Sequence, residues 1–166
     1  MGMEERLWHK SYAAGVKKSI DYEKITISEA LTRSATNFPD KTALNYMGKR
    51  ISYRELNDHV NRFAKALRDL GIEPGDKVGV CLPNIPQVII SDLAIFRVGA
   101  VVVQNNPLYT ERELAYQLND SDSKLVITLT LLVPRMEKIK PKTKLEKIIG
   151  CHIHTYLPFP KKQRFP

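Results

Sequence analysis

Short apolar segments alternate with longer segments of helical periodicity through the middle of the sequence. The apolar segments span residues 77–82, 100–103 and 124–128, and Pro, Gly, Asn or Asp residues lie between them and the helices. Apolar strands this short, separated by helices, are typical of a parallel sheet whose two faces are both covered. Right-handed crossovers place the connecting helices on both sides of such a sheet. The sequence therefore predicts an α/β fold with a parallel sheet and helices on both faces.

Three helix starts carry the same local signal, a capping box. In each, a Ser or Thr side chain can accept a hydrogen bond from the amide three residues on, and a Glu at that position can reach back. The pairs are Thr26/Glu29, Ser52/Glu55 and Thr110/Glu113. The helix after Ser52 is strongly amphipathic. We expect it to end at Gly71, because glycine readily adopts the left-handed conformation that ends a helix.

The remaining elements follow from composition and turn residues. A helix from residue 86 to about residue 98 is apolar nearly all round, which predicts burial on every side, and the strand after it is expected to be buried too. Residues 43–47 and 50–52 predict a short N-terminal β-hairpin around Gly48-Lys49. A short helix over 131–139 and a fourth strand over 145–149 complete the prediction.

The chain divides into three predicted parts. Residues 1–24 are polar and lack clear periodicity, so we expect an arm lying on the domain. Residues 25–155 form the domain itself. Residues 156–166 are basic and Pro-rich, and we interpret them as a segment cut in mid-domain.

Most of the positive charge lies near the C-terminus. Residues 134–166 hold nine Lys or Arg against two Glu, which is +7 of the net charge of +8. A nucleic-acid-binding domain should instead carry a basic face on its folded body. We therefore expect no nucleic-acid partner and at most a peripheral contact with a membrane. The alternative, that residues 134–166 bind nucleic acid or an acidic lipid surface, stays open and predicts salt-sensitive binding.

Neither a membrane span nor a secretory signal is evident. No stretch approaches the ~18–20 uncharged apolar residues of a spanning helix, and the N-terminus carries Glu4, Glu5 and Arg6 with no apolar run after them. The expected location is cytoplasmic. A disulfide scaffold normally has more cysteines in a smaller chain, so Cys81 and Cys151, 70 positions apart, are expected to be reduced thiols. Cys81 is expected to be a small buried residue.

The candidate substrate-facing surface lies where the predicted strands end. In parallel α/β sheets, ligands bind outside the carboxyl ends of the strands. Those ends carry Pro83 and Asn84 after the first strand, and Asn105, Asn106 and Pro107 after the second. The residues after Thr128 follow the third strand.

No residue pattern supplies a catalytic or metal centre. Neither common glycine-rich phosphate loop is present, and the eight glycines are scattered singly. His9 and His59 are isolated. Cys151, His152 and His154 cluster near the C-terminus, but a tetrahedral metal needs further ligands. We expect no catalytic, cofactor-binding or metal-binding residue in this sequence.

A series of short motifs occurs in a fixed order over residues 25–130: Phe38-Pro-Asp-Lys-Thr-Ala-Leu44, Ser52-Tyr-Arg-Glu-Leu56, Leu70-Gly71, Gly75-Asp-Lys-Val78, Leu82-Pro-Asn84, Gly99-Ala-Val101, Asn106-Pro107 and Glu113-Leu114. This order resembles the opening half of the large domain of adenylate-forming, or AMP-binding, enzymes. Two short stretches near the termini, LWHKSY at residues 7–12 and YLPFPKK at residues 156–162, look like those of long-chain fatty-acid:CoA ligases. The fold would then be an incomplete part of that large domain.

The resemblance implies a two-step reaction. A fatty acid and ATP form an acyl-adenylate with the help of Mg²⁺, and coenzyme A then displaces AMP. The family's Ser/Thr/Gly-rich phosphate loop, its adenine- and ribose-binding motifs and its C-terminal lysine are all absent here. We therefore expect ATP, Mg²⁺, coenzyme A and fatty acid to bind the remainder of a longer chain, which could form a homo-oligomer. This fragment alone is predicted to be inactive.

Two alternatives remain. The chain could be a free-standing α/β binding or regulatory module, which binding assays on the isolated chain would detect. It could also belong to another acid–thiol ligase of the same superfamily.

Overall fold

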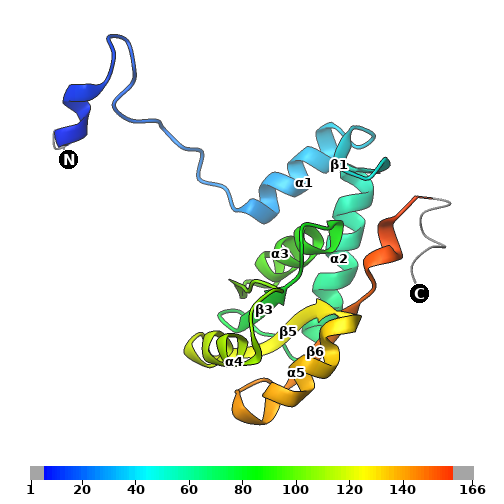
Figure 1. Cartoon of the computed structure of the whole chain (residues 1–166). Helices are drawn as coiled ribbons and strands as arrows, with labels where there is room; N and C mark the ends of the chain where they lie inside the picture. The colour runs from blue at the N-terminus through cyan, green and yellow to red at the C-terminus, as the bar shows by residue number, and fades with distance from the viewer. Residues whose placement is uncertain (1–5, 159–166) are drawn as a thin grey trace.

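Four parallel strands form the central sheet, in the order β4-β3-β5-β6. The computed structural model describes residues 6–158 (Figure 1). The strands are β3 (Lys77–Cys81), β4 (Val101–Gln104), β5 (Ser123–Leu129) and β6 (Lys147–Cys151). All three strand pairings are parallel, which confirms the predicted sheet.

Successive residues of the inner strands enter two different cores. Val78 and Val80 of β3 join one hydrophobic cluster, whereas Cys81 joins a second cluster on the other face. On β5, Val126 likewise lies in the second cluster and its neighbours in the first. This alternation is the period of two expected when both faces of a strand are covered.

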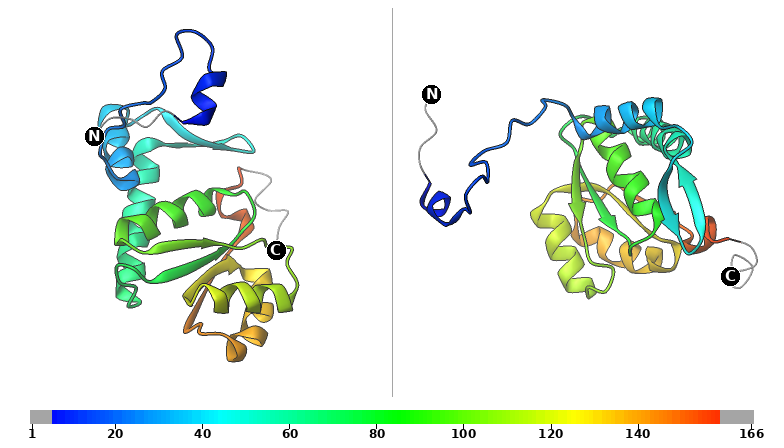
Figure 2. Two further views of the ribbon diagram at one scale, coloured as in Figure 1. Left: turned by 90° about the vertical axis from the view of Figure 1, so that its left-hand side faces the viewer. Right: turned by 90° about the horizontal axis from the view of Figure 1, so that it is seen from above.

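Helices cover both faces, as predicted (Figure 2). The helices α1 (Ile27–Asn37), α2 (Tyr53–Asp69) and α3 (Pro86–Val98) pack on the face of the first cluster. The helices α4 (Glu111–Asp120) and α5 (Val133–Ile139) pack on the face of the second. Short 3₁₀ turns flank α5, at Thr130–Leu132 and Lys140–Lys142.

All three predicted capping boxes form. At the start of α2, the Glu55 amide donates to Ser52 Oγ over 3.2 Å, and the Ser52 amide donates to Glu55 Oε2 over 2.7 Å. The same reciprocal pair opens α1 and α4. Gly71, with φ +83°, follows α2 at the predicted place.

The N-terminal hairpin turns one residue earlier than predicted. Strands β1 (Thr42–Tyr46) and β2 (Lys49–Ser52) pair antiparallel and form a separate two-stranded sheet. The turn is Met47-Gly48, with φ of 50° and 96°, instead of Gly48-Lys49. A two-residue hairpin loop favours positive φ at both positions, and Lys49 is already paired with Tyr46.

Three predictions about burial and boundaries are corrected. Strand β4 is an edge strand and not a buried one, so Val101 is 47% exposed. Helix α3 is not buried on every side, because Ile89 and Phe96 are each 40% exposed. The fourth strand lies two residues later than predicted: Leu145 is buried, but the pairing with β5 starts at Lys147.

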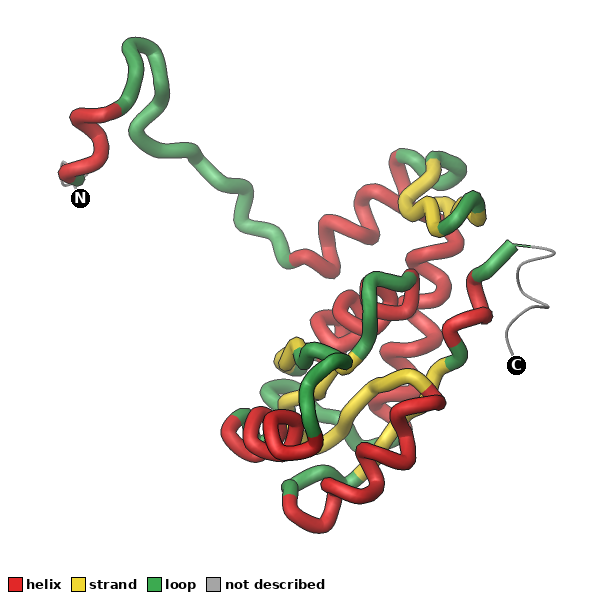
Figure 3. The backbone as a smooth tube through the Cα atoms, in the orientation of Figure 1, coloured by secondary structure: helices red, strands yellow, loops and turns green. Residues whose placement is uncertain are grey.

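The segment before α1 does not lie on the domain. Residues 10–25 are all exposed, and the chain there leads away from the helices as an open loop (Figure 3). An ion pair of 2.7 Å from Glu23 to Arg33 links its end to α1. Of the predicted C-terminal segment, residues 159–166 lie outside the described residues.

Candidate functional site

The five predicted loop residues lie together at the carboxyl ends of β3 and β4. A shallow depression of about 490 Å³ is lined by Leu82, Pro83, Asn84, Gln104, Asn105, Asn106, Pro107 and Leu108. The two loops meet because β3 and β4 are parallel neighbours in register. The residues after Thr128 do not contribute to this lining, although β5 also neighbours β3.

Asn105 anchors the depression from below. Its side chain is only 4% exposed, its amide N donates to Val80 O over 2.8 Å, and its Nδ2 donates to Val103 O over 2.7 Å. Its Oδ1 is buried and accepts no hydrogen bond from the described part of the chain. Asn105 therefore fixes the end of β4 to β3, which makes it a positioning residue for this loop.

The other predicted residues shape the rim. Asn106 Oδ1 accepts from the Leu108 amide over 2.9 Å, which is an Asx turn that closes the loop on itself. The Pro83 carbonyl accepts from the Ile85 amide over 2.7 Å. The side chain of Asn84 is exposed on the rim. No acidic, basic or nucleophilic side chain lines this depression, so these residues could bind a polar ligand but not transfer its protons.

A half-buried carboxylate lies behind the same edge. Asp92 of α3 accepts two hydrogen bonds from Gln104 Nε2, over 2.9 and 2.8 Å. Burial raises the pKa of Asp92, and the bond from Gln104 partly opposes this. Sequence reasoning missed the pair, because residues 92 and 104 meet only after α3 has folded back onto the sheet.

Replacing Asp92 by Asn is expected to stabilise the chain slightly at neutral pH. Because the folded pKa lies above the unfolded value, the carboxyl's stabilising contribution is present below the unfolded value and is lost as the pH rises through the folded pKa. Asn keeps an oxygen for Gln104. The gain should stay below about 1 kcal/mol, since the site is partly solvated. Urea unfolding at pH 7 should show this gain, and at pH 3.5 the two proteins should converge; a less stable Asp92→Asn variant at pH 7 would contradict the assignment.

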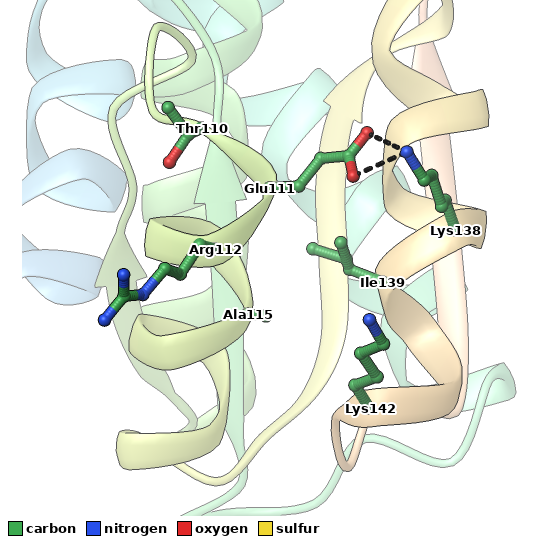
Figure 4. Close-up of a pocket in the computed structure, with 7 residues that line it drawn as sticks. All are labelled: Thr110, Glu111, Arg112, Ala115, Lys138, Ile139 and Lys142. Carbon is green, nitrogen blue, oxygen red and sulfur yellow. Dashed lines mark hydrogen bonds and ion pairs between the residues drawn. The ribbon is translucent and has the colours of Figure 1, made fainter.

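A second concave surface lies between α4 and α5 (Figure 4). This groove has a volume of about 600 Å³, and Glu111 and Lys138 bridge it with an ion pair of 2.8 Å. Ile139, 3% exposed, lies at its base, and Lys142 points into it in the close-up. Apart from Ala115 and Ile139 the lining is polar or charged, and the facing charges of Glu111 and Lys138 are paired with each other.

Most of the basic side chains between residues 135 and 147 bind other groups of the domain. Lys138 pairs with Glu111, and Lys144 pairs with Asp122. Arg135 donates to the Tyr109 carbonyl over 3.1 Å, and Lys147 donates to the Leu70 carbonyl. These side chains stabilise helix and strand ends, which favours the structural interpretation of this charge over a nucleic-acid or lipid surface for the residues described.

The histidines and cysteines near the C-terminus form no reactive centre. The rings of His152 and His154 stack at 5.1 Å, but within residues 6–158 no group of three or more His, Cys, Asp or Glu could hold a metal ion. Both cysteines are free thiols, as expected, and they belong to opposite faces of the sheet. Burial raises the pKa of Cys81 and of Cys151 to about 11, so neither is a thiolate at neutral pH.

The described residues also give no membrane-crossing element. No helix among residues 6–158 has the length and apolar character needed to cross a bilayer.

Comparison with known proteins identifies the fold's relatives. Residues 31–165 match the family model of the AMP-binding enzymes. The long-chain-fatty-acid–CoA ligase of Bacillus subtilis is 38% identical over 162 residues, which is 98% of this chain and 29% of the relative. The chain thus spans less than a third of the length of the curated relatives it matches.

Solved structures agree with this match. The crystal structure of a long-chain-fatty-acid-CoA ligase from Archaeoglobus fulgidus superposes with a TM-score of 0.74 and 26% identity, over 80% of this chain and 28% of that one. The structure of an anthranilate CoA ligase with anthranoyl-AMP has a TM-score of 0.71 and 26% identity, over 84% of this chain and 27% of that one. The resemblance to adenylate-forming acyl-CoA synthetases is confirmed, and the chain belongs to the AMP-binding enzyme family.

Proposed function

We propose that this chain is the N-terminal part of a long-chain fatty-acid:CoA ligase. The longer protein would form an acyl-adenylate from a fatty acid and ATP, and then an acyl-CoA. The observation that supports this most strongly is the 38% identity to the Bacillus subtilis ligase, since it extends over 98% of the chain. The longer protein would act in the cytoplasm.

The residues described here do not fit a nucleotide or magnesium site. The sequence has no glycine-rich phosphate loop, and no group of metal-binding side chains gathers within residues 6–158. The depression between β3 and β4 has no titratable side chain. We therefore assign ATP, Mg²⁺ and coenzyme A to the rest of the longer protein. The present chain would supply scaffold and one wall of a ligand cleft.

The test is fatty-acid-dependent exchange of pyrophosphate into ATP. The longer protein should catalyse this exchange with palmitate, and the 166-residue chain alone should give no signal above a blank without enzyme. If the short chain catalysed the exchange at a rate comparable to that of the longer protein, the assignment of the ATP site to the rest of the protein would be wrong. Failure of the longer protein with every carboxylic acid would overturn the ligase assignment.

A second candidate is a ligase for a different acid. The anthranilate CoA ligase structure is nearly as similar as the fatty-acid ligase structure, with TM-scores of 0.71 and 0.74. The matched region contains no residue that we can assign to acid selection. A panel of saturated fatty acids and aryl acids, compared by kcat/KM in the longer protein, separates the two. Preference for an aryl acid would favour this second candidate.

A further inference from the structure

The N-terminal segment, residues 6–25, carries large apolar side chains that the described domain leaves uncovered. The exposed fraction is 55% for Trp8, 63% for Ile20 and 81% for Tyr22. Figure 1 and the right-hand view of Figure 2 show the segment reaching away from the helices. These side chains therefore face water in the described structure.

Four of the large side chains recur at intervals of four residues: Trp8, Tyr12, Val16 and Ile20. An α-helix advances by about 100° per residue, so over residues 7–22 it would gather these four and Tyr22 in one sector of about 160°. The sector also holds three less apolar residues, His9, Gly15 and Ser19. The small and polar residues between the large ones hide this spacing in the sequence, which is why residues 1–24 read as polar without clear periodicity.

The rest of such a helix would be mainly cationic. Lys10, Lys17 and Lys18 fall outside the apolar sector, together with Asp21. Over residues 6–25, five Lys or Arg stand against two acidic residues, a net charge of +3, and Glu4 and Glu5 precede this stretch. A helix with aromatic and aliphatic residues on one face and lysines on the other is typical of segments that lie in the interface of a bilayer.

The N-terminal segment is not helical beyond its first residues. A short 3₁₀ helix spans Leu7–Ser11, and residues 12–26 contain no helix or strand. Gly15 has φ +89°, which is outside the helical region. An isolated helix of this length is marginal in water, and a central glycine weakens it further. The helix should therefore form when a surface buries its apolar face.

Charge and aromatic content select an anionic lipid surface as that partner. The lysines would face acidic headgroups, which attract cationic segments close to a membrane. Trp and Tyr favour the bilayer interface because each ring has an apolar body and a polar tip. The ion pair of Glu23 with Arg33 would keep the domain beside the surface. Long-chain fatty acids also partition into bilayers, because each buried CH₂ group is favourable there.

We propose that residues 7–22 fold into an amphipathic helix on an anionic phospholipid surface, with Trp8, Tyr12, Val16 and Ile20 toward the acyl chains and the lysines toward the headgroups. This goes beyond the proposed function, because it concerns attachment to a membrane surface and holds whichever acid the longer protein activates.

Trp8 reports directly on this binding, because it is the only tryptophan in the sequence. Its emission should shift to shorter wavelength when vesicles of phosphatidylcholine with about one third phosphatidylglycerol are added, and far-UV circular dichroism should show added helix. Binding to vesicles of phosphatidylcholine alone should be at least about tenfold weaker. Equal binding to both kinds of vesicle, or binding without added helix, would overturn the proposal.

Two substitutions of Gly15 test whether the bound segment is a helix. Gly15→Ala should strengthen binding to the anionic vesicles about fivefold, since alanine favours a helix more than glycine does. Gly15→Pro should weaken it at least about tenfold, because proline breaks a helix interior. A Cβ at Gly15 has no neighbour within 4 Å, so neither change disturbs the domain. If both variants bound equally well, the helix would be refuted.

A matched pair of serine variants tests which face is buried. Ile20 lies in the apolar sector, whereas Leu7 is even more exposed, at 83%, but lies outside it. Ile20→Ser should weaken vesicle binding about tenfold, because it removes an apolar side chain from the acyl boundary. Leu7→Ser should change binding less than about twofold. Equal losses in the two variants would contradict the proposed orientation.

A second copy of this chain is the competing partner. If two copies buried these side chains against each other, the chain would dimerise in sedimentation velocity without lipid, and the Trp8 emission would shift as the protein concentration rises. That result would refute the lipid assignment. So would a longer protein that does not bind anionic vesicles, even if it is an active ligase. A monomeric chain whose Trp8 emission shifts only with anionic vesicles is the outcome we expect.

Discussion

Exchange of Leu118 for alanine is expected to lower the free energy of unfolding of this chain by about 2–5 kcal/mol. Leu118 of α4 is fully buried and lies in the cluster between α4, α5 and the sheet. Its methyl group packs directly over Gly79 of β3: a Cβ built on that glycine would lie 2.9 Å from Leu118 Cδ2. Glycine thus lets the helix approach the strand closely, and the leucine fills the space.

Gly79→Ala should also destabilise the chain, because it adds a methyl group where the neighbouring side chains leave no room. The added methyl group would also lie 3.2 Å from Val126 Cγ2 and 3.4 Å from Asn105 Nδ2, so neighbours must shift. Overpacking of this kind costs about 1–3 kcal/mol. In the double variant the new methyl group enters space that Leu118 has left. The combined loss should therefore be smaller than the sum of the two single losses by about 1 kcal/mol.

Urea unfolding of the wild type, both single variants and the double variant measures this coupling. Leu67→Ala provides the matched control, because Leu67 is equally buried but packs on the other face of the sheet. Combined with Gly79→Ala, it should be additive. Strict additivity of Leu118→Ala with Gly79→Ala would show that the contact between helix and strand is not as described.

Local signals predicted the elements well because each depends on a few neighbouring residues. A capping box needs only a Ser or Thr and a Glu three positions later, and all three predicted boxes form. The depression at the strand ends could be predicted for a different reason. Parallel strands bring their carboxyl ends to one edge, so Asn84 and Asn105 had to lie near each other if β3 and β4 were neighbours.

Features that depend on pairing order were not predictable in the same way. A run of valines is compatible with an inner strand or an edge strand, and only the order β4-β3-β5-β6 shows that Val101 lies at an edge. Helix α3 reads as buried on every side, yet Ile89 and Phe96 are partly exposed in the described structure. Contacts such as that of Asp92 with Gln104 join residues that no sequence pattern pairs.

Arg97 shows the largest gap between sequence and structure. It reads as an ordinary polar residue near the end of α3, but its guanidinium group joins three helices. Nε donates to Ser28 Oγ over 2.9 Å and Nη1 donates to Asn57 Oδ1 over 3.0 Å. Further bonds reach Asn61 Oδ1, the Ser28 carbonyl and Thr32 Oγ1. All of these partners are neutral, and burial lowers the pKa of Arg97.

Arg97→Met is expected to lower the free energy of unfolding by about 1–3 kcal/mol, because it removes charge-assisted hydrogen bonds and leaves their acceptors unpaired. Arg97→Lys should recover only part of this loss, since an ammonium group cannot reproduce the planar fork. The effect should be concentrated in α1, whose only buried residue is Leu31. In Arg97→Met, the α1 amides should exchange faster, while those of α2 change little.

Arg33→Met is the matched control on α1 itself. Arg33 also makes a short contact, 2.7 Å to Glu23, but both side chains are more than half exposed. Such a surface pair contributes about 0–1 kcal/mol. If Arg33→Met destabilised the chain as much as Arg97→Met, the loss would reflect charge alone. A selective effect of Arg97→Met on α1 would mean that one arginine, through neutral acceptors, holds the first helix against the other two.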